Sequence, residues 1–152
     1  MLRRTSKGLS NEGVMAEGRH AEHKLSEIMV ALLREVTRLP DVLFVMGKGP
    51  KAVMEGWVDS DGTEVVVLDD WVAVESKPWH CHLHLTEVAE IRFVEEPDVH
   101  DTRRQSFSIR FLGGDGEPLL MIFFGRMYDD GDVLISDKVA RFHTLQEKYR
   151  PG

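Results

Sequence analysis

The sequence contains a single cysteine, Cys81, among its 152 residues, so the chain cannot form an internal disulfide. Secreted proteins of this size are often cross-linked by several disulfides, whereas cytosolic proteins keep their thiols reduced. A long hydrophobic run is also missing. The longest one, residues 118–124, is far shorter than the roughly 20 apolar residues that cross a membrane. Residues 1–8 lack the apolar segment of a signal peptide. These absences predict a cytoplasmic location and no membrane insertion.

Positive charge is scarce. The 19 Lys and Arg residues are outnumbered by 26 Asp and Glu residues, which gives a net charge of -7. Attraction to a phosphate backbone depends on clustered cations, and within residues 20–152 the only adjacent arginines are Arg103 and Arg104. The sequence therefore predicts that nucleic acid is not a partner.

The composition, with 42% hydrophobic residues, is that of an ordinary globular domain. Residues 1–19 are polar, contain glycine and show no periodicity, so we expect a disordered leader followed by one domain over residues 20–152. From about His20, apolar residues recur at spacings of three and four and predict a helix, which Pro40 ends. The predicted buried face of this helix contains Leu25, Ile28, Met29, Leu32, Leu33 and Val36.

Runs rich in β-branched and aromatic residues, separated by turns, predict strands in the middle of the chain. These runs are residues 41–46, 51–58, 64–68, 71–75, 79–85, 90–94, 105–112 and 119–124. The last two form the clearest hairpin. The final run is apolar on both faces, which indicates a central strand that is covered on each side.

A last helix is predicted from Ser136, with Ser136 as its N-cap and with Val139, Phe142, Leu145 and Tyr149 on its buried face. The fold class is therefore predicted to be α+β. We expect an antiparallel meander of about seven strands, flanked by an N-terminal and a C-terminal helix.

Three histidines alternate in the segment Trp79-His-Cys-His-Leu-His-Leu85. Successive side chains of a strand point to opposite faces, so His80, His82 and His84 share one face and Cys81 lies on the other. Imidazole is a ligand for haem iron and for zinc, and a strand face of solvated histidines is the plainer interpretation of the same pattern.

The chain resembles the cytoplasmic haem-utilisation carrier proteins of the HutX/ChuX type, each of which is similar to half of a HemS-like haem-trafficking protein. The resemblance covers residues 39–149. It depends on the order and spacing of HCHLHL from His80, IRFVEEP from Ile91, SFSIRFLGGDGEPLLMIFFGR from Ser106 and SDKVARFHTLQEKY from Ser136.

This resemblance implies a haem-binding protein for haem storage, trafficking or utilisation, a homodimer that mimics the two-part relatives, and haem held in a cleft beside the sheet. It favours a ligand-facing role for the histidine row, with His82 or His84 on the iron. His100 and Tyr128 are further ligand candidates. The haem propionates need cations, for which Arg92, Arg103 and Arg104 are the candidates.

Two other functions remain open. The spacing of His80, His82 and Glu87 is that of a cupin-like site for non-haem iron or zinc. However, Val74 stands where that pattern has a glycine, and the only asparagine is Asn11. The other alternative is a dimeric scaffold that binds a different apolar ligand or a protein. No nucleophile motif is present, and Cys81 lies on the apolar side of its strand, so we predict no catalytic residue.

Overall fold

The computed structural model describes residues 11–48 and 51–150, which form two α-helices, eight strands and one short 3-10 helix. In chain order, the elements are α1 (Asn11–Val36), β1 (Val42–Lys48), β2 (Ala52–Trp57), β3 (Glu64–Leu68), β4 (Trp71–Glu75), β5 (His80–His84), η1 (Leu85–Glu87), β6 (Val88–Pro97), β7 (Gln105–Gly113), β8 (Pro118–Phe124) and α2 (Ser136–Tyr149).

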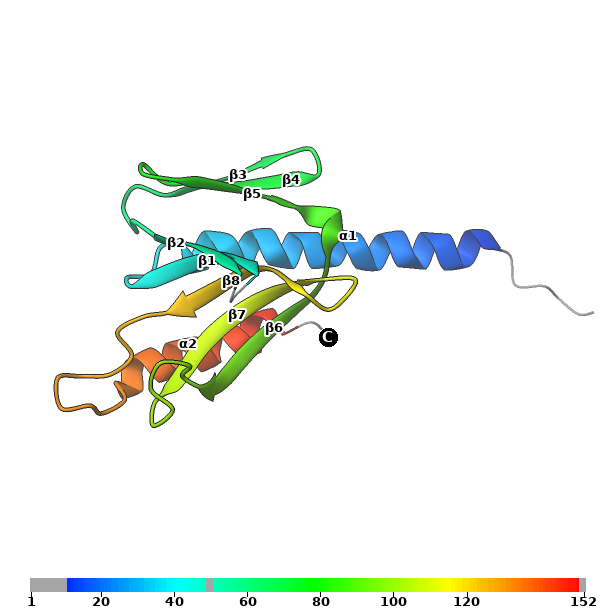
Figure 1. Ribbon diagram of the computed structural model, residues 1–152. Coiled ribbons are helices and arrows are strands. Elements are labelled where there is room, and N and C mark those ends of the chain that lie inside the picture. Colours follow the sequence, from blue (N-terminus) through cyan, green and yellow to red (C-terminus); the bar gives the residue numbers. More distant parts are fainter. Residues whose placement is uncertain (1–10, 49–50, 151–152) are drawn as a thin grey trace, which may run out of the picture.

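The strands form two antiparallel sheets. One has five strands in the order β2-β1-β8-β7-β6, and the other has three in the order β3-β4-β5. In Figure 1, α1 runs between the two sheets. α2 packs beside α1 on the same face of the five-stranded sheet, where Phe142 contacts Phe124 and Lys148 pairs with Glu35. The predicted α+β class is thus confirmed, as is the central position of residues 119–124, which lie in β8.

The structure differs from a single meander in one respect. After β2 the chain leaves the first sheet, builds the whole three-stranded sheet, and returns at β6. The reason is that β8 occupies the free side of β1, with Leu43 opposite Phe123. A pairing between residues 80 positions apart is not encoded in the local alternation of either strand.

Both helices bury the faces that their periodicity predicts. Met29, Leu32, Leu33 and Val36 of α1 are buried, and so are Phe142, Leu145 and Tyr149 of α2. Phe142 has no exposed surface and packs edge-on against Phe93, Phe107 and Phe124. These contacts attach α2 to one face of the five-stranded sheet.

The helix ends differ from their predictions. α1 begins at Asn11, earlier than the pattern from His20 indicates, and residues 1–10 of the predicted leader lie outside the described residues. Ser136 is not an N-cap. It is the first residue of α2, and the cap position is held by Ile135 without a side-chain hydrogen bond. Neither helix has the length and apolar composition that a membrane crossing requires, as judged from the described residues.

The five-stranded sheet has one face covered by helix and one face without such a cover. Residues directly opposite each other in an antiparallel pair point to the same side. Phe44 lies opposite Gly56 and Ile122, and this row belongs to the core side. The next residues along these strands therefore point to the other side, which we call the open face. It contains Leu43, Val45, Val53, Trp57, Met121 and Phe123.

Candidate functional site

A cavity of about 770 Å³ lies on the open face of the five-stranded sheet. Its floor is made of two rows that run across β2, β1 and β8. Trp57, Leu43 and Phe123 form the first row, and Glu55, Val45 and Met121 form the second. Every floor residue except Glu55 is apolar. The floor is therefore a broad apolar surface on the part of the sheet that β2, β1 and β8 form.

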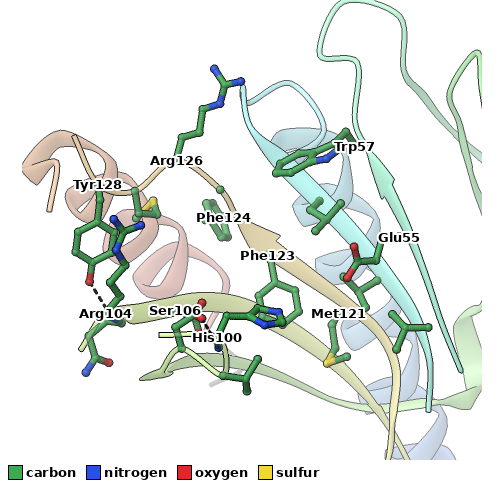
Figure 2. A pocket seen from close by; sticks show the side chains of 18 residues that line it. Glu55, Trp57, His100, Arg104, Ser106, Met121, Phe123, Phe124, Arg126 and Tyr128 are labelled. Carbon is green, nitrogen blue, oxygen red and sulfur yellow. Dashed lines mark hydrogen bonds between the residues drawn. The ribbon is translucent and has the colours of Figure 1, made fainter. Parts of the chain in front are cut away.

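Polar side chains gather at one end of this cavity, where Tyr128 and Arg104 lie side by side (Figure 2). The Tyr128 hydroxyl accepts a hydrogen bond of 2.7 Å from the backbone N–H of Gln105. The Arg104 guanidinium lies 4.9 Å from the centre of the Tyr128 ring and pairs with the Asp132 carboxylate. Its Nε is buried and has no hydrogen-bond partner within residues 11–48 and 51–150.

His100 reaches the cavity from the loop between β6 and β7. In Figure 2 its side chain extends from the loop toward the middle of the cavity, where Phe123 lies. The residue is exposed, and no hydrogen bond to its ring is found among the described residues. An imidazole without such a partner is available to bind iron or to accept a proton.

Arg126 stands at the mouth of the cavity on a strained turn. Its backbone φ is 49°, and Asp41, which contacts it, has a φ of 60°. The Asp41 carboxylate lies 3.5 Å from Arg126 Nε and 3.2 Å from Lys138 Nζ, while the Arg126 carbonyl accepts a hydrogen bond from Lys138. A left-handed conformation is uncommon for arginine, and such conformations are concentrated at functional sites. The Arg126 side chain is 80% exposed and stands at the edge of the cavity.

The histidine row has the alternation that the sequence predicts, but it lies elsewhere. Within β5, His82 is opposite Ala73 and His84 is opposite Trp71, on the outer face of the three-stranded sheet. Nε2 of His82 is 3.9 Å from the Glu75 carboxylate, and Nδ1 of His84 is 2.8 Å from the Thr86 hydroxyl. None of the three histidines lines the large cavity. His80 alone borders a smaller one, of about 310 Å³, beside Trp79 and Cys81.

The remaining candidates lie apart from the cavity. Arg92 forms two hydrogen bonds of 2.9 Å with the Glu90 carboxylate. Arg103 is bound to Asp101 and does not line the cavity. His80, His82 and Glu87 do not assemble into a metal site, since no group of three or more His, Cys, Asp and Glu side chains within the described ranges is placed to hold a metal ion. The cupin-like interpretation is therefore unsupported.

The cavity combines three kinds of chemistry. Its volume is within the range of about 300–1,000 Å³ typical of pockets that enclose small molecules. The apolar floor suits a flat hydrophobic ligand, the imidazole suits a metal carried by that ligand, and the guanidinium groups suit carboxylates. Three of the residues singled out in the sequence, His100, Arg104 and Tyr128, meet here.

Sequence reasoning missed the floor residues and Arg126. Val53 and Trp57 belong to a strand whose residues are nearly all exposed, so its alternation carries no signal of a buried face. The signal that could have found Arg126 is the Phe124-Gly125-Arg126 turn directly after the central strand. A glycine and a lone cation at the end of such a strand often mark a ligand site.

Comparisons with known proteins agree with this description. A protein-family model matches residues 30–149. The haem-binding protein ChuX superposes with a TM-score of 0.60 at 20% identity, over 76% of this chain and 69% of ChuX. PhuS, a haem-binding protein from Pseudomonas aeruginosa, gives a TM-score of 0.57 at 23% identity, over 84% of this chain and 34% of PhuS.

ChuS, a haem oxygenase from Escherichia coli, gives a TM-score of 0.57 at 16% identity, over 83% of this chain and 35% of ChuS. The chain thus spans about a third of the length of PhuS and of ChuS. No curated protein sequence matches it.

Proposed function

This chain belongs to the HutX/ChuX-type family of haem-utilisation proteins, and we propose that it binds haem in the open-face cavity and serves in haem storage, trafficking or utilisation. The observation that carries the proposal is the composition of the cavity. An apolar floor, a free imidazole and guanidinium groups border one space of about 770 Å³. A metalloporphyrin with two carboxylates can contact the floor with its ring, the imidazole with its metal and the guanidinium groups with its carboxylates.

Each part of the cavity has a role under this proposal. Phe123, Leu43 and Trp57 provide the surface on which the porphyrin lies, because burial of its apolar area is the main favourable term. His100 binds the iron that haem supplies. Arg104 and Arg126 bind the propionates, since guanidinium groups form strong charge-assisted hydrogen bonds with carboxylates. Tyr128 holds Arg104 in place through its ring.

The histidine row remains the second candidate for the iron ligand. His82 and His84 stand on the outer face of the three-stranded sheet, beside the exposed apolar residues Leu68 and Trp71. The family resemblance favours this row, whereas the cavity favours His100. The two candidates are on different sheets, so single substitutions separate them.

The site is tested by titrating purified protein with hemin and following Soret absorbance. We expect saturation at one hemin per chain, a shifted Soret band and weaker binding in His100→Ala, and an unchanged spectrum in His82→Ala and His84→Ala. Cys81→Ser is the matched control, because its thiol points to the opposite face of β5. Absence of saturation would reject haem binding. A normal spectrum in His100→Ala with a shifted one in His82→Ala would move the ligand to β5.

We further propose that the protein is a cytoplasmic homodimer whose two open faces meet and enclose the cavity. Val53 and Trp57, on the open face, are 50% and 57% exposed, which is unusual for large apolar side chains of one sheet. PhuS and ChuS are about three times as long as the matched part, so one such chain has room for two units of this fold. Cys81, whose pKa burial raises to about 11, is suited to remain a reduced thiol.

The dimer is tested by light scattering during size-exclusion chromatography. The mass should be twice that of the 17.3 kDa chain and should fall to the mass of one chain in Trp57→Glu, because a carboxylate cannot be buried unpaired between two apolar faces. A dimeric Trp57→Glu variant would show that the contact lies elsewhere.

A further inference from the structure

A backbone hydrogen bond joins the two ends of the loop that carries His100. It spans residues 98–104, between β6 and β7. The backbone N–H of Asp98 donates to the carbonyl of Arg104 at 2.8 Å, which closes the loop at its base. The N–H of Arg104 donates in turn to the carbonyl of Asp101 at 2.9 Å. The segment is therefore built as a compact turn and not as a free flap.

The Asp98 carboxylate provides the inner contacts of this turn. Its Oδ1 accepts the backbone N–H of His100 at 2.7 Å and that of Asp101 at 3.1 Å. These two amides lie on either side of the His100 α-carbon. Holding both of them restricts the two backbone dihedrals of His100, and these dihedrals set the direction of its side chain.

We propose that Asp98 is a positioning residue that fixes the His100 imidazole over the cavity. The inference rests on the proposed function, in which His100 binds the iron. Asp98 borders the cavity, but its Oδ1 is occupied by the two loop amides. Its carboxylate replaces water as the partner of two loop amides, so the imidazole is oriented before a ligand arrives and less conformational entropy is lost on binding.

A second carboxylate in the same loop serves as a built-in control. Asp101 accepts hydrogen bonds from the backbone N–H and the guanidinium of Arg103, at 3.1, 2.9 and 2.8 Å. These contacts, led by the guanidinium hydrogen bond, lower the pKa of Asp101 to about 2. Neither Asp101 nor Arg103 lines the cavity. Removing the Asp101 carboxylate deletes the same charge from the same loop but leaves the His100 amide bonded to Asp98.

The first measurement uses the ligand-free protein. Amide hydrogen exchange by NMR should show protected N–H groups at His100 and Asp101. Asp98→Ala should lose this protection at both, Asp98→Asn should retain much of it because its amide oxygen still accepts, and Asp101→Ala should leave His100 protected. Equal protection of His100 in the parent protein and in Asp98→Ala would overturn the inference.

The second measurement uses hemin. Asp98→Ala should bind it about tenfold more weakly, the lower end of the loss seen when an orienting partner of a metal ligand is removed. Asp98→Asn should restore most of the affinity, and Asp101→Ala should bind as the parent does. Normal affinity in Asp98→Ala with a defect in His100→Ala would reject the role of Asp98 alone. Normal affinity and spectrum in His100→Ala would reject both this inference and the proposed iron ligand.

Discussion

At the scale of single residues, the shape of the cavity depends on Gly125. A β-carbon at this position would lie 2.8 Å from the Trp57 ring and 3.0 Å from the Asp41 carbonyl oxygen. The N–H of Gly125 also donates to that carbonyl at 2.7 Å, so the backbone has little freedom to retreat. The absent side chain is what allows the Trp57 ring to lie beside Gly125 at the edge of the floor.

Gly125→Ala is therefore expected to displace Trp57, to weaken hemin binding and to lower stability by roughly 1–3 kcal/mol, the usual cost of overpacking. Gly114→Ala is the matched control, because nothing lies within 4 Å of a β-carbon there. Urea denaturation measures the stability of both variants, and hemin titration measures their affinity for hemin. Equal stability and affinity in the two variants would contradict the proposed packing.

The residues also show the limit of prediction from sequence. Alternation placed His80, His82 and His84 on one face of a strand correctly, because side-chain direction follows from local geometry. The alternation does not show that this face is the outer face of a separate three-stranded sheet. That depends on which strands pair, and pairing is decided by contacts between distant segments.

At the scale of elements, α1 and α2 are joined by an ion pair and a hydrogen bond at one point. Glu35 accepts hydrogen bonds from Lys148, at 2.7 Å, and from the Tyr149 hydroxyl. The hydrogen bond from Lys148 is the largest cause of the lowered pKa of Glu35, followed by that from Tyr149. A carboxyl group whose pKa is lower in the folded state contributes stability above its unfolded pKa and loses it as pH falls through the folded value.

Glu35→Gln should accordingly reduce the free energy of unfolding at neutral pH, by a small amount because the site is partly solvated. In acid below the folded pKa of Glu35, the variant and the parent should become equally stable. Urea denaturation over a pH series measures the difference, with Glu147→Gln on the exposed side of α2 as the control. A difference that grows in acid would show that Glu35 stabilises the fold in its protonated form.

Both helices and each of the eight strands fall on segments that the sequence indicates, although about seven strands are predicted because residues 64–68 and 71–75 could form one strand or two. Residues 64–68 and 71–75 match β3 and β4 to the residue. The predicted first residues of the two helices agree less well with the structure. α2 lacks the side-chain cap that Ser136 was expected to provide, and α1 extends to Asn11 through residues with little apolar periodicity.

At the scale of the whole molecule, the site is assembled from four separate regions of the chain. The floor comes from β1, β2 and β8, and the rim comes from the loop at 98–104 and the turn after β8. Single candidates such as His100, Arg104 and Tyr128 could be named from the sequence, because their chemistry is distinctive. Their convergence on an apolar face could not be, since it follows from the order β2-β1-β8-β7-β6.

The location of the ligand is the central claim, and NMR with gallium protoporphyrin IX, a diamagnetic relative of haem, tests it most directly. We predict saturable shifts of backbone amides around the cavity, at residues 53–57, 98–106 and 121–128, with little change at residues 80–84. Shifts confined to residues 80–84, or no shifts at one porphyrin per chain, would contradict the account.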